Sequence, residues 1–275
     1  MLNAITIDLE DWYQGLTSTS WRIDRWPDYE NRIAANTDRV LAILSQAGVK
    51  ATFFVLGYVA DHLPEIIRKV ANEGHEIALH SYYHKRVHTL TPSQFREDIA
   101  RALDAVQRSS GALVLGYRAP MFSINRSTTW VFDELCEMGF RYDSSIFPIR
   151  NLYYGIPGAS RFPYHPLKND PFIEFPLSTI RFLRMTFPIA GGFYGRVLPY
   201  TLLKAGIHHI NHQRQPAILY FHPWEFDMGQ HFYQVTPRER ITHYYGRAGL
   251  GAKFIRLLQD FKFGPLSSLL SSVSW

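Results

Sequence analysis

Two histidines four positions apart, His80 and His84, are the residues of this 275-residue chain that most directly suggest chemistry. They follow an apolar, strand-like run at residues 77–79. On a helical turn or a tight loop this spacing puts both imidazoles on one side, where both can reach one cation. Two histidines, a carboxylate and an open position are typical of catalytic zinc. Because the chain has twelve histidines, a chance H-x-x-x-H is the alternative.

Polar residues also follow four other apolar segments that we expect to be strands. These groups are Asp8-Leu9-Glu10-Asp11, Arg118-Ala119-Pro120, Asp143-Ser144-Ser145 and His222-Pro223-Trp224-Glu225. In a barrel of parallel strands, catalytic groups lie at the carboxyl ends of the strands. Together with His80, the four groups therefore predict one shared site.

Short apolar runs alternate with helical patterns, which is typical of βα units around a parallel sheet or barrel. Strands are predicted at residues 4–7, 51–55, 76–79, 114–117, just before 143, and at 217–221. Helices are predicted at about 33–48, 64–70, 91–106, 127–138, 199–211 and 252–261, the third opening with the capping box Thr91-Pro92-Ser93-Gln94.

Between about 145 and 195 this alternation gives way to sequence rich in proline, glycine and aromatic residues. Loops of this length in a compact domain are usually functional. We therefore expect a single domain over residues 1–275 with a long loop insertion at about 145–195. We expect the Ser/Leu-rich tail at 266–274 to pack or fray.

The composition argues against a nucleic-acid-binding protein. The net charge is +5 and the pI is about 9.2, but only 19% of the residues are charged, and the lysines and arginines are scattered. A phosphate-binding surface needs clustered positive charge. The excess of positive charge is compatible with an anionic substrate or a membrane-bound lipid carrier.

The chain shows no signal for export or membrane insertion. The single cysteine, Cys136, cannot form an intrachain disulfide, which fits a reducing compartment, and we expect it to be a buried, inert thiol. The first residues run directly into a predicted strand, and no run of 18 apolar residues occurs. We expect a cytoplasmic protein, free or at the inner face of the membrane.

Five motifs, in this order, resemble those of the polysaccharide deacetylases of carbohydrate esterase family 4, which share the NodB homology domain. They are Thr6-Ile7-Asp8-Leu9-Glu10-Asp11, His80-Ser81-Tyr82-Tyr83-His84, Tyr117-Arg118-Ala119-Pro120, Tyr142-Asp143-Ser144-Ser145 and Leu219-Tyr220-Phe221-His222-Pro223. The resemblance implies an α/β fold, a single distorted (β/α) barrel with about seven parallel strands. Gly191-Gly192-Phe193-Tyr194 and His-Pro-Trp-Glu resemble the branch found with bacterial exopolysaccharide gene clusters.

By this resemblance His80 and His84 hold one divalent metal, zinc first and cobalt or nickel as alternatives, and Asp8 is the general base. Such a metal makes a nucleophile at neutral pH by lowering the pKa of bound water from 15.7 towards ~7. His222 is the general acid that protonates the leaving amine, and Arg118 orients Asp8 and keeps it ionised. The metal and a backbone amide near Tyr82 stabilise the oxyanion.

The resemblance leaves two candidates for the third metal ligand, because Leu9 stands where most members of the family have a second aspartate. On an extended strand, residues two apart face the same side, which favours Glu10 beside Asp8. If the strand turns at Leu9, Asp11 takes this place.

The predicted substrate contacts are Tyr82, Pro120, Phe122 and Trp224. Phe122 and Trp224 are either platforms for a sugar ring or core residues. Four other polar residues near the motifs have two possible roles each. Asp143 either caps a turn or contacts the substrate, and Glu225 is either a partner of His222 or solvated. His75 and His88 lie either at the surface or behind the metal ligands. Gly191-Gly192 is expected to form a turn.

The leading hypothesis is a metal-dependent hydrolase that removes N-acetyl groups from amino sugars of a polysaccharide, or of its lipid-linked precursor, and releases acetate. The expected partner is thus an N-acetylated oligo- or polysaccharide, with peripheral membrane association and no nucleic acid. One alternative is an amidohydrolase acting on a small N-acyl or ureide compound, favoured by a closed pocket under residues 145–195. Another is a catalytically silent carbohydrate-binding module, which predicts the loss of a base, ligand or acid.

Overall fold

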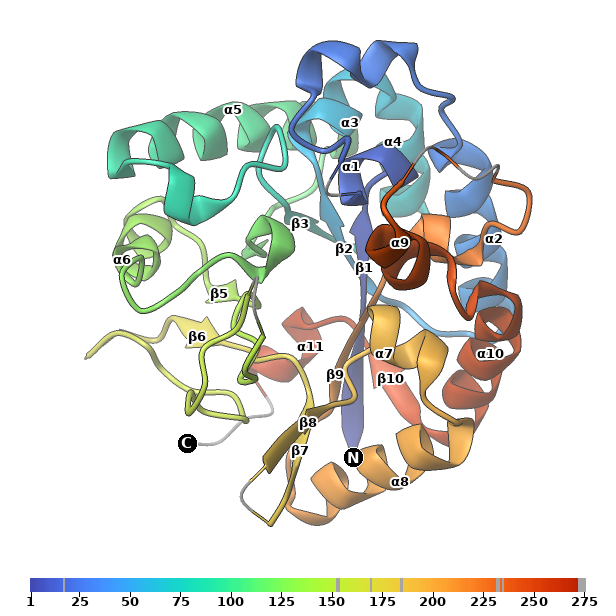
Figure 1. Cartoon of the computed structure of the whole chain (residues 1–275). Coiled ribbons are helices and arrows are strands. Elements are labelled where there is room, and N and C mark those ends of the chain that lie inside the picture. The colour runs from blue at the N-terminus through green and yellow to red at the C-terminus, as the bar shows by residue number, and fades with distance from the viewer. Residues whose placement is uncertain are drawn as a thin grey trace.

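The computed structural model describes the whole chain except residues 17, 152–153, 169, 184, 231–232, 234 and 272–275. Eight parallel strands of the described chain form one curved sheet in the order β10-β1-β2-β3-β4-β5-β6, with β9 paired to β1 (Figure 1). They are β1 (Leu2–Leu9), β2 (Thr52–Val55), β3 (Glu76–Leu79), β4 (Gly116–Tyr117), β5 (Tyr142–Asp143), β6 (Ile173–Glu174), β9 (Ile218–Phe221) and β10 (Lys262–Gly264). The predicted distorted (β/α) barrel of about seven parallel strands is confirmed, with β10 as a short addition.

Strand β1 is the centre of the sheet because it pairs with three others. Ala4 pairs with both Ile218 of β9 and Gly264 of β10, so these two strands lie on opposite sides of β1. Thr6 pairs with Thr52 of β2 further along the same strand. The first and the last thirds of the chain therefore meet on β1.

The two faces of β1 separate the core from the site. Ile5, Ile7 and Leu9 face outward into the layer of helices, where they join the largest apolar cluster. The alternate positions point into the barrel: Ala4 joins an interior apolar cluster, and Asp8 is buried beyond it at the carboxyl end of the strand.

The other end of the barrel is closed by helix α11 (Ser267–Leu270) and the residues before it. Leu266 and Leu269 are buried against Ala4, Phe54 and Ala78 inside the barrel. The described part of the predicted tail therefore packs, while residues 272–274 lie outside the described residues.

Helices surround the sheet (Figure 1). The longer ones are α2 (Ile33–Gln46), α4 (Pro64–Asn72), α5 (Pro92–Ser110), α6 (Trp130–Glu137), α8 (Tyr200–His212) and α10 (Leu250–Asp260), and the short ones are α1 (Trp12–Gly15), α3 (Gly57–His62), α7 (Gly192–Val197) and α9 (Pro237–Glu239). The capping box at Thr91 forms as predicted, with the Thr91 side chain accepting from Gln94 N. No helix among the described residues has the length and apolar character needed to cross a bilayer.

The segment 145–195 is more regular than the predicted loop. It contains β6, the antiparallel hairpin of β7 (Thr179–Phe182) and β8 (Met185–Pro188), and the start of α7. Ser178 N donates to Ile218 O, which links this segment to β9.

Gly191 explains why α7 can begin so close to the sheet. Its φ is 113°, and a Cβ atom there would overlap the carbonyl oxygen of Tyr220 on β9. Only glycine combines this backbone conformation with so close an approach. The Gly191-Gly192 pair, predicted to form a turn, thus lets the chain pass β9 and enter α7.

Candidate active site

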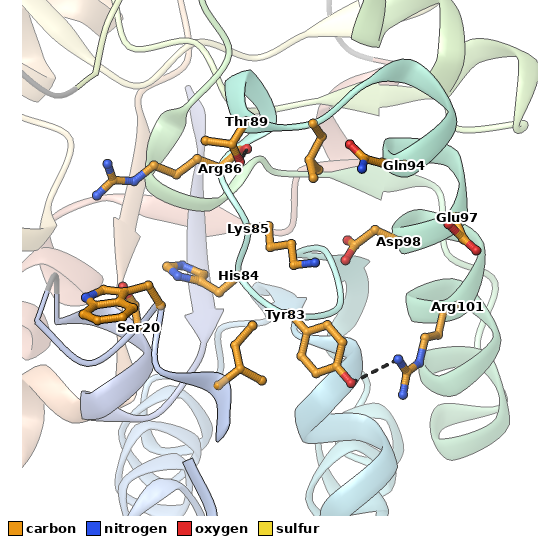
Figure 2. Close-up of a pocket in the computed structure, with 13 residues that line it drawn as sticks. Ser20, Tyr83, His84, Lys85, Arg86, Thr89, Gln94, Glu97, Asp98 and Arg101 are labelled. Carbon is orange, nitrogen blue, oxygen red and sulfur yellow. Dashed lines mark hydrogen bonds between the residues drawn. The ribbon is translucent and has the colours of Figure 1, made fainter. Parts of the chain in front are cut away.

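The loop after β3 carries both histidines of the H-x-x-x-H motif. Figure 2 shows His84, Lys85 and Arg86 of this loop opposite helix α5. Ser81 and His84 have positive φ angles of 62° and 55°, so the loop turns sharply back on itself. The ring centroids of His80 and His84 consequently lie 5.2 Å apart. The pair is thus positioned by a tight loop and not by a helix.

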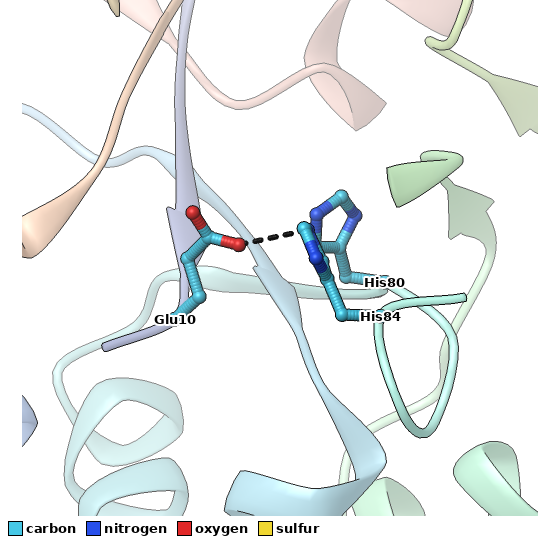
Figure 3. A group of neighbouring side chains, drawn as sticks. All are labelled: Glu10, His80 and His84. Atoms are coloured by element: carbon cyan, nitrogen blue, oxygen red, sulfur yellow. Dashed lines mark ion pairs between the residues drawn. The ribbon is translucent and has the colours of Figure 1, made fainter. Parts of the chain in front are cut away.

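Glu10 joins the two histidines at the carboxyl end of β1 (Figure 3). One ligand atom from each of Glu10, His80 and His84 lies within 4.8 Å of those of the other two, and all three residues are buried. Glu10 Oε2 lies 2.9 Å from His84 Nε2 and is otherwise buried without a donor in the described chain.

Asp11, the alternative ligand, is used elsewhere. Its carboxylate caps α1 by accepting from Trp12 N, and it also accepts from the backbone nitrogens of Arg32 and Ile33. Burial raises the pKa of Asp11 to about 6 despite these hydrogen bonds. Of the two carboxylates, the structure therefore places Glu10 with the histidines.

The donor set fits a divalent metal such as zinc. His80 Nδ1 is 2.8 Å from Arg118 O, which leaves Nε2 of the same ring for a metal. Burial, with His84 nearby, lowers the pKa of His80 well below its usual value, which favours the neutral, ligating form. Burial raises the pKa of Glu10, but His84, His222 and His80 outweigh it and keep the carboxylate ionised.

Asp8 lies beside this group and is held by Arg118. The guanidinium donates to Asp8 Oδ1 over 2.6 Å, and Arg118 is completely buried. Its remaining donors reach Thr6 Oγ1 and both the carbonyl and the hydroxyl oxygen of Ser144. The Asp-Ser-Ser motif thus fixes Arg118, and Arg118 fixes Asp8.

Asp143 is buried and caps a turn, one of the two roles predicted for it. Its carboxylate accepts hydrogen bonds from the backbone nitrogen and the hydroxyl of Ser145. The Ser145 hydroxyl in turn accepts from Ala119 N. Asp143 does not line the site cavity.

His222 faces the same carboxylates from β9. Its Nε2 lies 3.9 Å from Asp8 Oδ2 and 3.6 Å from Glu10 Oε1, and its Nδ1 lies 3.3 Å from Glu225 Oε2. Burial lowers the pKa of His222, but Glu225, Glu10 and Asp8 raise it to about 9. The ring is therefore able to carry a proton at neutral pH.

Glu225 is the partner of His222 and is not solvated. It is fully buried, accepts from His222 N over 3.0 Å, and forms a 2.7 Å ion pair with Arg196. Arg196 also donates to the carbonyl oxygens of Thr242, His243 and Tyr245. Arg196 was not predicted from the sequence, because it lies on α7 outside the motifs.

Trp224 borders the site cavity but is buried, so of its two predicted roles, sugar platform or core residue, its contacts favour the core residue. Its ring stacks between His222 and His243, with centroid distances of 4.8 and 4.0 Å and interplanar angles below 20°. Both faces are thus covered by imidazoles. Instead, Trp224 Nε1 donates to Glu10 Oε1 over 3.2 Å, which positions the carboxylate.

The structure does not place Tyr82 at the predicted substrate contact, and a backbone amide near it that would stabilise the oxyanion is not its own. Tyr82 N donates to Asp98 Oδ2 over 2.9 Å, and the Tyr82 hydroxyl donates to Asp61. The residue is buried and does not line the site cavity, so its amide is not free for an oxyanion. Pro120 is likewise buried and outside the cavity lining.

Phe122 is a core residue that also borders the cavity. It packs on Phe147, Tyr154 and Tyr220, and it is one of the residues that line the cavity. Met121 and Phe122 have positive φ angles of 55° and 49°, an uncommon conformation that bends the chain around the cavity wall. Met121 also lines the cavity, and no motif predicted it.

His75 and His88 lie away from the metal ligands. His75 is buried at the amino end of β3, where Nδ1 accepts from Ala51 N, so the expectation of a surface or supporting position is wrong. His88 is exposed, as one of the two expectations had it.

The site opens into a cavity of about 420 Å³. Asp8, Glu10, His80, His84 and His222 line its floor, and its walls include residues of the 145–195 segment and of α9 and its continuation. The cavity lining includes Asn151, Tyr154, Tyr194, Arg238 and Thr242. All five predicted base, acid and ligand positions therefore reach one enclosed space.

Comparison with known families divides the chain into two matched parts. Residues 23–142 match the polysaccharide deacetylase family, and residues 144–271 match a domain of unknown function, DUF3473. A peptidoglycan-N-acetylglucosamine deacetylase of Bacillus cereus is 37% identical over 75 residues, which is 27% of each chain. A chitooligosaccharide deacetylase of Bradyrhizobium is 36% identical over 85 residues, 30% of this chain and 39% of the relative. The chain thus spans only about a third of the curated relatives it matches.

Similar folds occur among solved structures. A putative polysaccharide deacetylase from Mycobacterium smegmatis superposes with a TM-score of 0.68 at 23% identity, covering 99% of this chain and 89% of the other. A family 4 carbohydrate esterase from Streptomyces lividans in complex with acetate has a TM-score of 0.53 at 14% identity, covering 94% of this chain and 86% of the other. A CE4 family pseudoenzyme from Bacillus anthracis has a TM-score of 0.53 at 15% identity, covering 98% of this chain and 65% of the other. At these identities the likeness concerns the fold.

Proposed function

We propose that this protein is a carbohydrate N-deacetylase, which hydrolyses the N-acetyl group of an amino sugar and releases acetate; the match of residues 23–142 to the polysaccharide deacetylase family supports this. One observation supports this most: Asp8 and His222, a carboxylate and a proton-bearing imidazole, flank Glu10, His80 and His84 in one cavity. Amide hydrolysis needs both a base and an acid at the reacting carbon.

We assign each step to a residue of the chain. Asp8, paired with and oriented by Arg118, takes a proton from the attacking water. His222, protonated and held by Glu225, gives a proton to the leaving nitrogen. Glu10, His80 and His84 would hold a divalent metal, for which we propose zinc; when bound, the metal supplies Lewis acidity that acidifies water and polarises the acetyl carbonyl.

For the substrate we propose an amino sugar of a polysaccharide or of its lipid-linked precursor, in exopolysaccharide synthesis. The site cavity is walled by residues of the 145–195 segment, which favours the alternative of a small N-acyl or ureide compound. However, a larger neighbouring cavity shares His84 and Arg86 with it, which gives a longer substrate a path. The third hypothesis, a silent module, is disfavoured because Asp8, Glu10, His80, His84 and His222 are all present in the cavity.

For location we propose a cytoplasmic protein that binds the inner face of the membrane through the β7–β8 hairpin. The hairpin projects from the end of the barrel that holds the N-terminus (Figure 1). Phe182, Leu183 and Met185 at its tip are 58–79% exposed, and Arg181 adds a positive charge beside them. Exposed apolar side chains next to a basic group suit an anionic bilayer surface.

The proposed activity is tested by measuring acetate release from N-acetylated oligosaccharides. We expect activity from zinc-loaded protein, loss of activity after chelation, and recovery on adding zinc, cobalt or nickel. Asp8→Asn should lower kcat at least 100-fold because it removes the base. Asp104→Asn is the matched control, since Asp104 is exposed on α5 and pairs only with Arg108 among the ion pairs found. Full activity of metal-free protein, or of Asp8→Asn, would contradict the proposal.

A further inference from the structure

A second cavity, of about 940 Å³, adjoins the site cavity. His84 and Arg86 line both cavities, so the two are neighbours across the loop that carries the metal ligand. We call this second cavity the Arg86 groove; its lining also includes Trp21, Tyr83, Lys85, Glu97, Asp98 and Arg101. A substrate larger than one sugar can extend from the site into it.

Arg86 stands out among the arginines near the site because its charge is not compensated. Arg118, Arg196 and Arg101 each donate to carboxylate, carbonyl or hydroxyl oxygens. In the described chain, the half-buried Arg86 guanidinium has no ion pair and no hydrogen bond. A partly buried charge without a partner is costly unless a ligand supplies the counter-charge.

The acidic residues of the groove lie on its other wall and do not face Arg86. Figure 2 shows Glu97 and Asp98 on α5, whereas the Arg86 side chain points away from α5, to the side of the His84 ring. Asp98 accepts from Tyr82 N, and Lys85 lies near Asp98 and over the Tyr83 ring at 5.8 Å. Asp98 is therefore engaged within its own wall, and neither Glu97 nor Asp98 forms an ion pair with Arg86 in the described chain.

An exposed aromatic ring completes the groove. Trp21 is 68% exposed, whereas Trp224, the ring expected to hold a sugar, is buried. Indole rings present an apolar face on which sugar rings stack. Arg22 lies over the Trp21 ring at 5.2 Å, and its charge is paired with Asp24 at 3.8 Å, so Arg86 is the arginine of this region that lacks a partner in the described chain.

We propose that the Arg86 groove binds the sugar next to the one that is deacetylated, and that Arg86 selects substrates in which that sugar carries an anionic group. This inference rests on the proposed function and names its substrate class, an acidic amino-sugar polymer or precursor. A guanidinium binds carboxylates and phosphates through paired donors, so the anion is a uronic acid carboxylate or a sugar phosphate.

The test first measures binding, which does not depend on activity. Isothermal titration of the zinc-loaded protein compares three probes: a hyaluronan tetrasaccharide, which carries uronic acids, neutral chitotetraose, and UDP-N-acetylglucosamine, which carries phosphates. We expect at least one anionic probe to bind about tenfold more tightly than chitotetraose, and Arg86→Gln to remove most of that difference. Arg86→Lys should restore part of it. Arg68→Gln, which removes the same charge from an exposed position on α4, should leave it unchanged.

The outcomes separate this inference from the proposed activity. A preference for hyaluronan assigns the anion to a carboxylate, and a preference for the nucleotide sugar assigns it to a phosphate; in either case the preference must depend on Arg86. Equal binding of all three probes, or a preference that survives in Arg86→Gln, overturns the inference even if acetate is released. Tight, Arg86-dependent binding without acetate release overturns the activity alone. For a substrate that is turned over, Arg86→Gln should raise KM more than it lowers kcat.

Discussion

At the scale of single residues, the position of Glu10 depends on neighbours that lie outside the catalytic set. Trp224 Nε1 donates to Glu10 Oε1, and Gly15 lies so close that a Cβ there would be 2.6 Å from the same oxygen. Hydrogen bonds to a metal-ligating carboxylate orient it and tune the affinity of the site. Trp224 is thus a positioning residue, and its two stacked histidines keep its ring in place.

We therefore expect Trp224→Phe to weaken metal binding about tenfold, because phenylalanine keeps part of the stacking but cannot donate to Glu10. Competition with a zinc chelator measures the affinity. Trp130→Phe is the matched control, since Trp130 lies on α6 and packs on Phe95. Equal zinc affinities of Trp224→Phe and the wild type would refute this role for Trp224.

The residues that bear charge were largely predictable from the sequence, and their neighbours were not. The two-residue repeat of a strand places Glu10 on the face of Asp8, which is why the choice of Glu10 over Asp11 agrees with the geometry. Arg196 and the stacking of Trp224 between His222 and His243 depend on contacts between segments far apart in sequence. No spacing pattern in one chain carries that information.

At the scale of elements, the end of the barrel opposite the site holds a buried titratable group. His75, before β3, is 6% exposed and accepts from Ala51 N before β2. Burial, with Lys50 nearby, lowers the pKa of His75 to about 4. In the unfolded chain its pKa is about 6.5.

The stability of this end should therefore depend on pH. Above pH 6.5 His75 is neutral in both states; between pH 6.5 and about 4 only the unfolded state takes up the proton, so stability falls as the pH falls. With allowance for solvent screening, we expect His75 to lower the free energy of unfolding by about 2 kcal/mol between about pH 7 and pH 4.5. Urea unfolding at the two pH values measures this loss. In His75→Asn the loss of stability should be smaller by the same amount. The same pH dependence in both proteins would count against this account.

The β7–β8 hairpin is the element on which the membrane proposal depends. Replacing Phe182 and Met185 by aspartate removes exposed apolar area without disturbing the core, since both side chains are more than half exposed. We expect this double variant to sediment with phosphatidylglycerol vesicles at least fivefold less than the wild type. Leu113→Asp, at another exposed leucine, is the control. Absence of vesicle binding by the wild type would end this proposal.

Elements with a strong local signal were predictable, and two short strands were not. The capping box and apolar face of α5 and the buried runs of β2, β3 and β9 are strong local signals. β6 has two residues and β10 has three, so no periodicity can reveal them. They form strands because β5 pairs with β6 and β1 pairs with β10.

At the scale of the whole molecule, the two family matches meet within one sheet. The polysaccharide deacetylase match ends at residue 142 and the second begins at 144, yet β5 at this junction pairs with β4 on one side and β6 on the other. Of the proposed site residues, Asp8 and Glu10 precede the first match, His80, His84 and Arg118 lie within it, and His222 with Glu225 and Arg196 lies within the second. We propose that the two matched parts form one folding domain, because neither contains the whole site.

Leu266 offers a test of this proposal, because it lies in the second part and packs inside the barrel against Phe54 and Ala78 of the first, and against Ala4, which precedes both. Leu266→Ala should lower the free energy of unfolding by about 3 kcal/mol, the usual cost of a buried leucine truncated to alanine. If the chain is one cooperative unit, tryptophan fluorescence and far-ultraviolet circular dichroism should report the same urea midpoint in both proteins, and both should shift together. Leu202→Ala, at a leucine 55% exposed on α8, should leave the midpoint unchanged. Two separate transitions, with only one moved by Leu266→Ala, would instead mean that the matched parts fold independently and that the site is assembled from two domains.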